Sequence, residues 1–243
     1  MDKKKISVCM ATYNGEKYIG EQLHSILKQL GENDEVIISD DGSSDSTLYI
    51  IEAINDPRIH LYKNEGEHGY TKNFENALKH SDGEIIFISD QDDVWMDDKV
   101  RVMCEALKYK QLAVHDAEVT DAELNVTIPS FFEHYKIEQG FLRTLAYTRY
   151  TGACMAMTRE FLELCLPFPD NQNLCPYDYW FVYLGEYTHE AILIRMPLIQ
   201  YRRHENTALH AGEYSTRTTK EKIDTRIYCL KEMMKRIRER KKR

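Results

Sequence analysis

Three carboxylates, Asp90, Asp92 and Asp93, directly follow an apolar run at residues 85–88. Like charges this close repel one another, so the cluster costs stability unless a cation or a reaction makes use of it. At the end of a buried strand, an Asp-x-Asp pair is well placed to hold a divalent metal ion against a diphosphate. The alternative is a solvated acidic turn that caps the following helix.

Apolar runs and helical patterns alternate along the first part of the chain. Strands are expected at residues 6–11, 36–38, 59–62 and 85–89, and helices at residues 19–30, 45–54 and 71–79. The run at 6–11 is continuously apolar, as in a strand buried on both faces. This alternation predicts an α/β fold with a mainly parallel central sheet and helices on both faces.

Polar residues follow three of the predicted strands. Asn14, Asp40 and Asp90 each lie just past a strand end. Ligands of parallel sheets bind beyond the carboxyl ends of the strands, so three separate loops are expected to bring polar groups to one edge. The helix after Asp40 is expected to begin at Asp45, with Ser44 as its N-cap.

Several segments together are similar to one enzyme family. In chain order they are residues 7–15, 36–43, 69–73 and 89–95, with 177–180 and 201–206 further downstream. Over roughly residues 5–207 the chain resembles family 2 glycosyltransferases, which implies a GT-A fold with a nucleotide-binding N-terminal half. The sequence Ser-Asp-Gln-Asp-Asp-Val-Trp, with Asp-Tyr-Trp and Tyr-Arg-Arg-His, looks most like the bacterial rhamnosyltransferase branch.

The resemblance implies a role for each carboxylate. Asp90 and Asp92 would hold Mn²⁺ or Mg²⁺, because hard oxygen ligands suit these ions and a cation stabilises a diphosphate leaving group. Asp93 would orient this pair or touch the donor sugar. Asp40 would accept a hydrogen bond from the N3–H of uracil or thymine; alternatively, Asp40 or Asp41 begins an Asx turn. The expected donor-binding residues are Thr12, Tyr13, Asn14, Asp40, Asp41, Asn73, Asp90, Gln91, Asp93, Arg202 and Arg203.

Asp178 is the expected general base, since inversion at an anomeric carbon needs one group that takes the acceptor proton. The residue follows Pro176 and opens an aromatic helix at residues 177–183. The family often has Glu-Asp where this chain has Tyr-Asp, and a helix cap is the alternative role. His204 would complete the metal shell, or else face phosphate or solvent. The expected acceptor-binding residues are Trp95, Gly152, Tyr179 and Trp180, with core packing an equal alternative for Tyr179.

The composition fits one globular domain, with 42% hydrophobic and 30% charged residues among 243. We expect a nucleotide-sugar-binding half at residues 1–110, an acceptor-binding and catalytic half at 111–219, and a basic helix at 220–243. No apolar run is long enough to span a bilayer, and no signal peptide pattern is found. The six cysteines form no Cys-x-x-Cys pair, which favours reduced thiols in the cytoplasm.

Charge is unevenly distributed along the chain. The formal net charge is −8, yet residues 231–243 hold eight basic and two acidic residues. Before and within this segment, apolar residues recur at helical spacing, at positions 223, 227, 230, 234 and 237. Such a helix could rest on an anionic membrane surface, or it could dock on the protein and end in a solvated tail. Nucleic acid is not an expected partner, because the rest of the chain is acidic.

These inferences predict an inverting, metal-dependent glycosyltransferase with a UDP- or dTDP-sugar donor, rhamnose being favoured. The acceptor would be a cell-surface polysaccharide or lipid-linked glycan at the cytoplasmic face of the membrane. A nucleotidyltransferase is the first alternative, but it would need a basic triphosphate loop, and residues 12–16 contain no Arg. A non-catalytic nucleotide- or sugar-binding module is the second, and it would need no Asp178.

Overall fold

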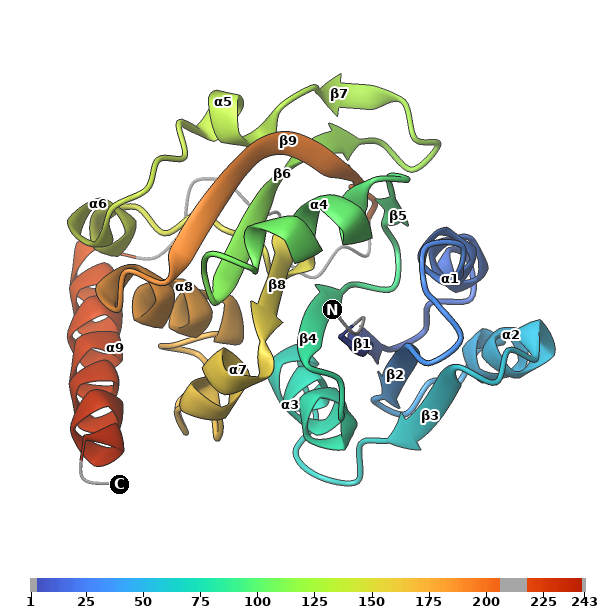
Figure 1. Ribbon diagram of the computed structural model, residues 1–243, viewed down its shortest axis with the longest axis horizontal. Helices are drawn as coiled ribbons and strands as arrows, with labels where there is room; N and C mark the ends of the chain where they lie inside the picture. Colours follow the sequence, from blue (N-terminus) through green and yellow to red (C-terminus); the bar gives the residue numbers. More distant parts are fainter. Residues whose placement is uncertain (1–3, 206–217, 242–243) are drawn as a thin grey trace.

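The computed structural model describes residues 4–205 and 218–241 (Figure 1). In the first part of the chain, strands alternate with helices: β1 (Ile6–Thr12), α1 (Ile19–Leu27), β2 (Glu35–Asp40), α2 (Thr47–Ile54), β3 (Ile59–Lys63), α3 (Tyr70–His80) and β4 (Ile85–Ser89). The strands pair in the order β3-β2-β1-β4, and all of them run parallel. The predicted parallel α/β unit is therefore confirmed.

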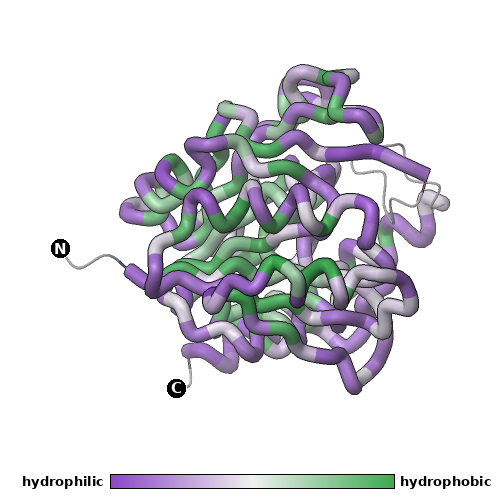
Figure 2. The backbone as a smooth tube through the Cα atoms, turned by 90° about the vertical axis from the view of Figure 1, so that its right-hand side faces the viewer, coloured by the Kyte–Doolittle hydropathy of each residue, from purple (hydrophilic) through white to green (hydrophobic). Residues whose placement is uncertain are grey.

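Both faces of this parallel unit are covered. Every residue of β2 and of β4 is buried, which explains why these strands carry continuous apolar runs. In Figure 1, α1 and α2 lie on one face of the strands and α3 lies on the other. Figure 2 shows the hydrophobic stretches gathered through the middle of the molecule, with hydrophilic turns around them.

The rest of the chain extends the same sheet and adds helices around it. Its elements are β5 (Val94–Trp95), α4 (Lys99–Ala106), β6 (Leu112–Thr120), β7 (Val126–Ile128), α5 (Phe131–Tyr135), α6 (Phe141–Ala146), the 3-10 turn η1 (Gly152–Cys154), β8 (Met155–Thr158), α7 (Arg159–Cys165), α8 (Tyr177–Tyr187), β9 (Ala191–Arg202) and α9 (Thr219–Arg240). β8 joins β4 to β6 and is antiparallel to both. The sheet is thus parallel in its first half and mixed in its second.

Strand β9 links β6 to β5 and so brings its own carboxyl end beside the acidic loop at residues 90–93. It runs parallel to β6 and then, at its far end, pairs antiparallel with β5. In Figure 1 this long strand arches over β6. Because β5 directly follows the acidic loop at residues 90–93, the arch brings the carboxyl end of β9 back beside that loop.

The three central strands β1, β2 and β4 end within two residues of one another in register. Thr12 at the end of β1 pairs with Asp40 at the end of β2, and Met10 pairs with Ser89 at the end of β4. The loops after β1, β2 and β4 therefore open at the same edge of the sheet, as the sequence predicted.

The start of α2 differs from the prediction. The helix begins at Thr47 with Ser46 as its N-cap, two residues later than Asp45 and Ser44. The Asp45 carboxylate accepts hydrogen bonds from the backbone N–H groups of Thr47, at 3.0 Å, and Glu16, at 3.1 Å. Asp45 therefore holds the turn before the helix and is not part of it.

The C-terminal helix α9 docks on the protein. Its side chains Thr225, Cys229 and Met233 are buried, whereas Ile223 and Ile227 of the predicted apolar stripe are 48% and 46% exposed. The docking alternative is thus confirmed, with a buried face rotated from the predicted one. Among the residues that the structure describes, no helix is long and apolar enough to cross a membrane.

Arg236 provides a polar link between α9 and the body of the protein. Its guanidinium donates to the carbonyl oxygens of Leu164, Leu166 and Pro167, which close the end of α7. It also lies 5.5 Å from the centre of the Trp180 ring. These carbonyls would lose a charged donor if Arg236 were removed.

We expect Arg236→Ala to lower the free energy of unfolding by about 2 kcal/mol, since hydrogen bonds from a charged donor to three carbonyls are lost. For a chain of this size that corresponds to a fall of about 4–8 °C in the melting temperature. Calorimetry should show this fall in Arg236→Ala and nearly none in Lys235→Ala, an exposed neighbour on the same helix. Equal melting temperatures for the two variants would contradict the docking role.

Candidate active site

The acidic loop at residues 90–93 is held from behind by α1. The amide of Gln22 donates to the Ser89 hydroxyl and to the Asp90 carbonyl, each at 2.9 Å. Asp93 is 1% exposed, and one of its carboxylate oxygens accepts from the backbone N–H of Arg202 at 3.0 Å. The loop is therefore fixed to both α1 and the end of β9.

Negative charge in this loop is poorly balanced. Burial, followed by the charges of Asp92 and Asp178, raises the pKa of the Asp90 carboxyl to about 7. Burial and the charges of Asp92 and Asp90 hold the pKa of Asp93 well above its usual range. A bound cation would relieve this repulsion, which is the behaviour expected of a metal site.

Asp92 and His204 form a pair across the arch of β9. The imidazole Nε2 of His204 lies 2.8 Å from a carboxylate oxygen of Asp92, and the side chains are 12% and 16% exposed. Neighbouring ligands of an octahedral ion with bonds of about 2.1 Å are about 3 Å apart. The contact is a hydrogen bond in the metal-free protein, and its length also matches the spacing of adjacent ligands around one ion. The donor set would suit Mn²⁺ or Mg²⁺ with further oxygen ligands.

The protein alone does not complete such a shell. Within residues 4–205 and 218–241, no group of three or more His, Cys, Asp and Glu side chains could hold a metal ion by itself. The remaining ligands would have to come from a bound phosphate group or from water, as is usual for Mg²⁺ sites.

Asp178 lies at the first turn of α8, facing the acidic loop. Pro176 is the N-cap residue, and a carboxylate oxygen of Asp178 accepts from the backbone N–H of Tyr179 at 2.8 Å. The charge of Asp178 contributes to the raised pKa of Asp90, after burial and Asp92. The structure therefore brings the predicted base near the predicted metal loop, although they are far apart in sequence.

The loop after β1 is attached to the acidic loop through Gln91. The side-chain carbonyl of Gln91 accepts from the Thr12 hydroxyl at 2.5 Å and from the Tyr13 backbone N–H at 3.0 Å. Asn73 supports the same strand end by donating to the Thr12 carbonyl at 3.1 Å. Asn14 adopts a positive φ of 47° and accepts from the Ser44 backbone N–H. The ring of Tyr13 is 57% exposed.

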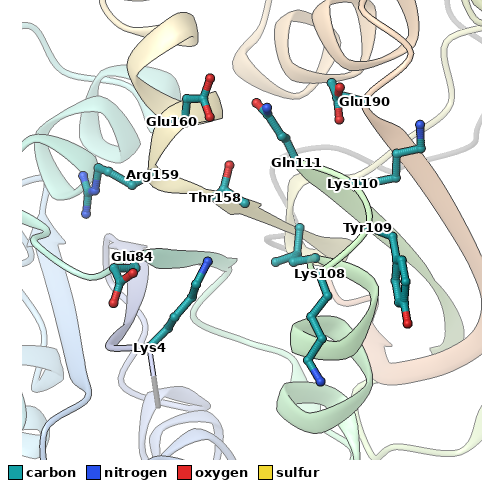
Figure 3. Close-up of a pocket in the computed structure, with 11 residues that line it drawn as sticks. Lys4, Glu84, Lys108, Tyr109, Lys110, Gln111, Thr158, Arg159, Glu160 and Glu190 are labelled. Carbon is teal, nitrogen blue, oxygen red and sulfur yellow. The ribbon is translucent and has the colours of Figure 1, made fainter. Parts of the chain in front are cut away.

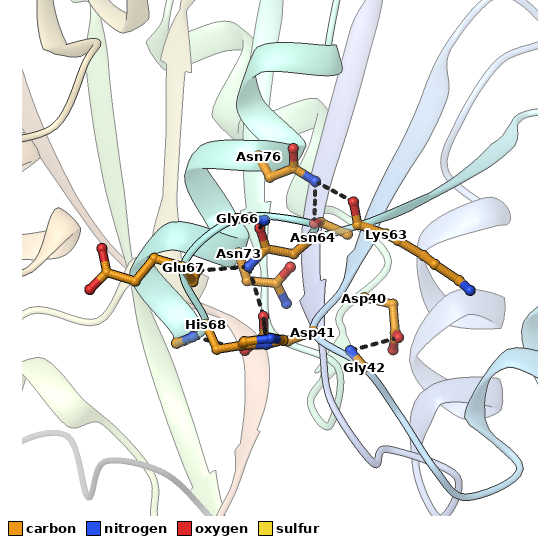
Figure 4. A network of polar contacts seen from close by, with 12 residues as sticks. Asp40, Asp41, Gly42, Lys63, Asn64, Gly66, Glu67, His68, Asn73 and Asn76 are labelled. Atoms are coloured by element: carbon orange, nitrogen blue, oxygen red, sulfur yellow. Dashed lines mark hydrogen bonds and ion pairs between the residues drawn. The ribbon is translucent and has the colours of Figure 1, made fainter.

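Asp40 and Asp41 organise the loops after β2 and β3 (Figure 4). Asp40 is 1% exposed and accepts from the backbone N–H groups of Gly42, at 3.0 Å, and Ser43, at 2.9 Å. This is the turn that the sequence allowed as an alternative. Asp41 accepts from the Asn64 amide at 2.7 Å and from the Gly69 backbone N–H at 2.8 Å. Both carboxylates thus shape the rim of the edge, and a role for Asp40 in binding a base stays a prediction.

Comparison with known proteins settles the family. The family model described as "Glycosyl transferase family 2" matches residues 7–165. The chain belongs to glycosyl transferase family 2. It is 30% identical to the dTDP-rhamnosyl transferase RfbG of Shigella flexneri, over 84% of this chain and 74% of that protein. It is 36% identical to the UDP-Glc:alpha-D-GlcNAc-diphosphoundecaprenol beta-1,3-glucosyltransferase WfgD of Escherichia coli, over 42% of this chain. That match spans only 40% of WfgD.

Solved structures confirm the GT-A fold of this family 2 chain. Staphylococcus aureus TarS in complex with UDP-GlcNAc superposes with a TM-score of 0.68 at 20% identity, over 91% of this chain and 64% of that one. Mycobacterium tuberculosis glucosyl-3-phosphoglycerate synthase, solved with Mn²⁺, UDP and phosphoglyceric acid, gives a TM-score of 0.59 at 18% identity. The match covers 83% of this chain and 72% of the synthase.

The prediction that Trp95 and Trp180 bind the acceptor is wrong. Trp95 and Trp180 are 1% and 0% exposed, so neither ring offers a face to a sugar. Trp180 instead donates its indole N–H to the Cys165 carbonyl at 2.8 Å. Tyr179 is partly buried and packs against the core and the Tyr183 ring, in keeping with its alternative role.

Gly152, Arg202 and Arg203 make packing or hydrogen-bond contacts within the protein. A Cβ at Gly152 would lie 2.0 Å from the Tyr177 hydroxyl, so glycine lets the start of α8 pack closely. Arg202 is 4% exposed and donates to backbone carbonyls, which contradicts its predicted contact with a diphosphate. Arg203 is partly buried and donates to the Tyr135 hydroxyl at 3.2 Å. The last residue of the predicted segment 201–206 lies outside the described residues.

Sequence reasoning missed Lys99. This side chain is fully buried, donates to the Ala153 carbonyl at 2.8 Å and lies 4.2 Å from the centre of the Trp95 ring. Burial lowers the pKa of its amine to about 7, against the raising effect of Cys154, Asp93 and Asp90. The sequence offers no signal for it, because a lysine near a helix start usually faces solvent.

A cavity of about 380 Å³ lies at the opposite edge of the sheet (Figure 3). Its lining includes Glu84 and Gln111, which directly precede β4 and β6, and Lys4, which lies two residues before β1. Acidic and basic side chains alternate around it, and none of the predicted site residues takes part. The cavity is therefore not the candidate active site, which lies at the carboxyl ends of the strands.

Proposed function

We propose that this protein is an inverting, metal-dependent glycosyltransferase. It would move a sugar, with rhamnose favoured, from a UDP- or dTDP-linked donor to a glycan or lipid-linked acceptor. The observation that carries the proposal is the Asp92–His204 pair, 2.8 Å apart, beside Asp90 and within the electrostatic reach of Asp178. The whole group lies where the parallel strands end, which is the binding edge of such sheets.

The metal ion would be held by Asp92 and His204, with Asp90 adding negative charge beside it. When bound, Mn²⁺ or Mg²⁺ would stabilise the negative charge that grows on the diphosphate as the glycosidic bond breaks. The M. tuberculosis synthase of the same fold was solved with Mn²⁺ and UDP, which supports a divalent ion here.

Asp178 would act as the general base. An acceptor hydroxyl attacks the anomeric carbon from the face opposite the diphosphate, and its proton passes to a carboxylate oxygen of Asp178. The carboxylate is partly buried and stays oriented by the Tyr179 backbone N–H. Gly152, Tyr177 and Lys99 would support the base from behind, because Gly152 packs on Tyr177 and Lys99 binds the adjacent Ala153 carbonyl.

Residues 1–110 would supply most of the donor site and residues 111–219 the acceptor side. RfbG is named for a dTDP-linked sugar and WfgD for a UDP-linked one, and TarS was solved with UDP-GlcNAc. Thymine and uracil share an N3–H donor that neutral cytosine lacks. The match with RfbG, at 84% of this chain, supports dTDP-rhamnose as the favoured donor.

We expect UDP and dTDP to bind roughly tenfold to a hundredfold more tightly than CDP and GDP. Asp40 already accepts from Gly42 and Ser43, and a base without an N3–H donor would leave its remaining acceptor position unpaired, at a cost of about 1–3 kcal/mol. Calorimetry on the four nucleotides tests this, and turnover of the matching nucleotide sugars tests the whole proposal. In Asp40→Asn the gap between UDP and CDP affinity should narrow, because the amide can donate to the N3 of cytosine, and an unchanged melting temperature would report an intact turn. Equal binding of all four nucleotides to the unaltered protein would contradict base reading by Asp40.

We also propose that the C-terminal helix α9 contacts an anionic membrane surface at the cytoplasmic face. WfgD is named for a diphosphoundecaprenol-linked acceptor, which supports a lipid-linked substrate. On α9, Ile223 and Ile227 remain exposed on a helix that also carries many basic residues. Flotation with anionic vesicles at low salt should recover the intact chain and less of the double variant Ile223→Ser, Ile227→Ser. If the intact chain does not float with the vesicles, the proposed membrane contact is contradicted.

A further inference from the structure

A single tyrosine ring contacts two residues at the carboxyl end of β9. The ring of Tyr18 has its centre 4.5 Å from the guanidinium carbon of Arg202 and 4.7 Å from the centre of the His204 imidazole. Tyr18 is 8% exposed and occupies the N-cap position of α1. The orientation of His204 therefore depends on a residue from the first helix of the chain.

Arg202 uses its donors on the protein. Its Nε donates to the Asp92 carbonyl at 2.8 Å, and one terminal nitrogen donates to the Ala122 carbonyl at 2.7 Å. The other terminal nitrogen binds a carboxylate oxygen of Glu21 at 2.5 Å. A rigid guanidinium fork that spans three partners in this way fixes their relative positions.

These contacts connect both members of the pair to α1. His204 is packed against Tyr18, and the backbone of Asp92 is held by Arg202, which itself rests on Tyr18 and Glu21. A 2.8 Å separation between ligand atoms is kept only if both side chains stay in place. Mutation of a residue that orients a metal ligand commonly lowers metal affinity by about tenfold to a hundredfold.

We propose that Tyr18, Glu21 and Arg202 are positioning residues that align Asp92 and His204 for the same divalent ion. The inference rests on the proposed metal-dependent function. Only the turn at residues 15–18 separates α1 from the loop of Thr12 to Asn14, so the helix connects this loop to the metal pair. Metal and nucleotide should therefore bind with positive coupling that depends on the Tyr18 ring.

The test compares Tyr18→Leu with Tyr18→Phe in the full chain. Mn²⁺ binding in the presence of UDP is measured by calorimetry and by the paramagnetic resonance of free Mn²⁺. Leucine fills space but removes the ring, so Mn²⁺ affinity should fall about tenfold. Phenylalanine keeps the ring, so its affinity should stay within about twofold. UDP affinity in EDTA and the melting temperature report whether the fold is intact.

Each outcome decides a separate point. If the unaltered protein binds no Mn²⁺, the metal-dependent function and the positioning role are both overturned. If the unaltered protein and Tyr18→Leu bind Mn²⁺ equally, only the positioning role is overturned. An equal loss of Mn²⁺ affinity and metal-free UDP affinity would indicate a general structural role and would also overturn it.

A second variant keeps the proposal testable if Tyr18→Leu does not fold. Glu21 has a side chain that is 52% exposed, so Glu21→Ala leaves the core unchanged. Freed from this partner, Arg202 should hold the Asp92 carbonyl less firmly, and Mn²⁺ affinity should fall about threefold. Glu16→Ala, on the loop before α1, is the matched exposed control and should leave Mn²⁺ affinity unchanged. No difference between the two variants would contradict the positioning role.

Discussion

Replacing Asp178 with asparagine is expected to lower kcat by a factor of about 10²–10⁴, the usual contribution of a positioned general base. Asparagine keeps the size of the side chain and an oxygen that accepts from the Tyr179 backbone N–H. The fold and the start of α8 should therefore be unchanged. Only the ability to take the acceptor proton is lost, so the affinity for the donor nucleotide should stay within about twofold.

Steady-state kinetics with a soluble acceptor measures this effect. The matched control is Asp170→Asn, an exposed carboxylate in the loop before the same helix, which should keep full activity. If Asp178→Asn retained kcat within about threefold, the base would have to be another group and Asp178 would be a helix cap only. A large loss that is accompanied by lost nucleotide binding would also contradict the assignment.

The parallel half of the sheet was predictable because its signals are local. β1, β2 and β4 are buried on both faces, so each contains an unbroken apolar stretch at its centre, followed by turn residues. The polar groups at their ends were predictable for the same reason, since the carboxyl ends of neighbouring parallel strands share one edge. The position of Asp40 and Asp90 at this edge follows from strand order, which the alternation of strands and helices already indicates.

The second half of the sheet was not predictable in the same way. β9 contains Pro197 and charged residues, and its pairing with β6 shifts register at His115–Asp116 and again at Asp116–Glu118. Such irregularities break the alternation of side chains that identifies a strand. The arch of β9, and with it the place of Arg202, is a tertiary property that no local pattern contains.

Failures at individual site residues have a common physical cause. Trp95 and Trp180 have the chemistry to stack on a sugar, but the same large rings also gain most from burial in the core. Arg202 has the chemistry to bind a diphosphate, yet its planar fork suits backbone carbonyls equally well. Residue type alone cannot separate these uses, because exposure decides between them and exposure is set by packing.

Asp92→Asn is expected to lower transfer activity at least about a thousandfold, because loss of one metal ligand removes several kcal/mol of charge stabilisation on the diphosphate. The same change should make the metal-free protein more stable. Folding raises the pKa of Asp90 to about 7, so the folded protein binds more protons at this group than the unfolded chain does between about pH 4 and pH 7, and the raised pKa of Asp93 acts in the same direction. Their contribution to stability is therefore lost as the pH rises through this window.

Removal of the Asp92 charge lowers the repulsion on both neighbours. In EDTA at pH 8, the melting temperature of Asp92→Asn should exceed that of the unaltered protein by about 2–4 °C, which corresponds to about 1 kcal/mol. At pH 4 the difference should vanish, because Asp90 and Asp93 are then protonated in both proteins. In Mn²⁺ with UDP the order should reverse, since only the unaltered protein gains stability from the bound ion. Full activity of Asp92→Asn, or of the unaltered enzyme in EDTA, would show that the pair holds no catalytic metal.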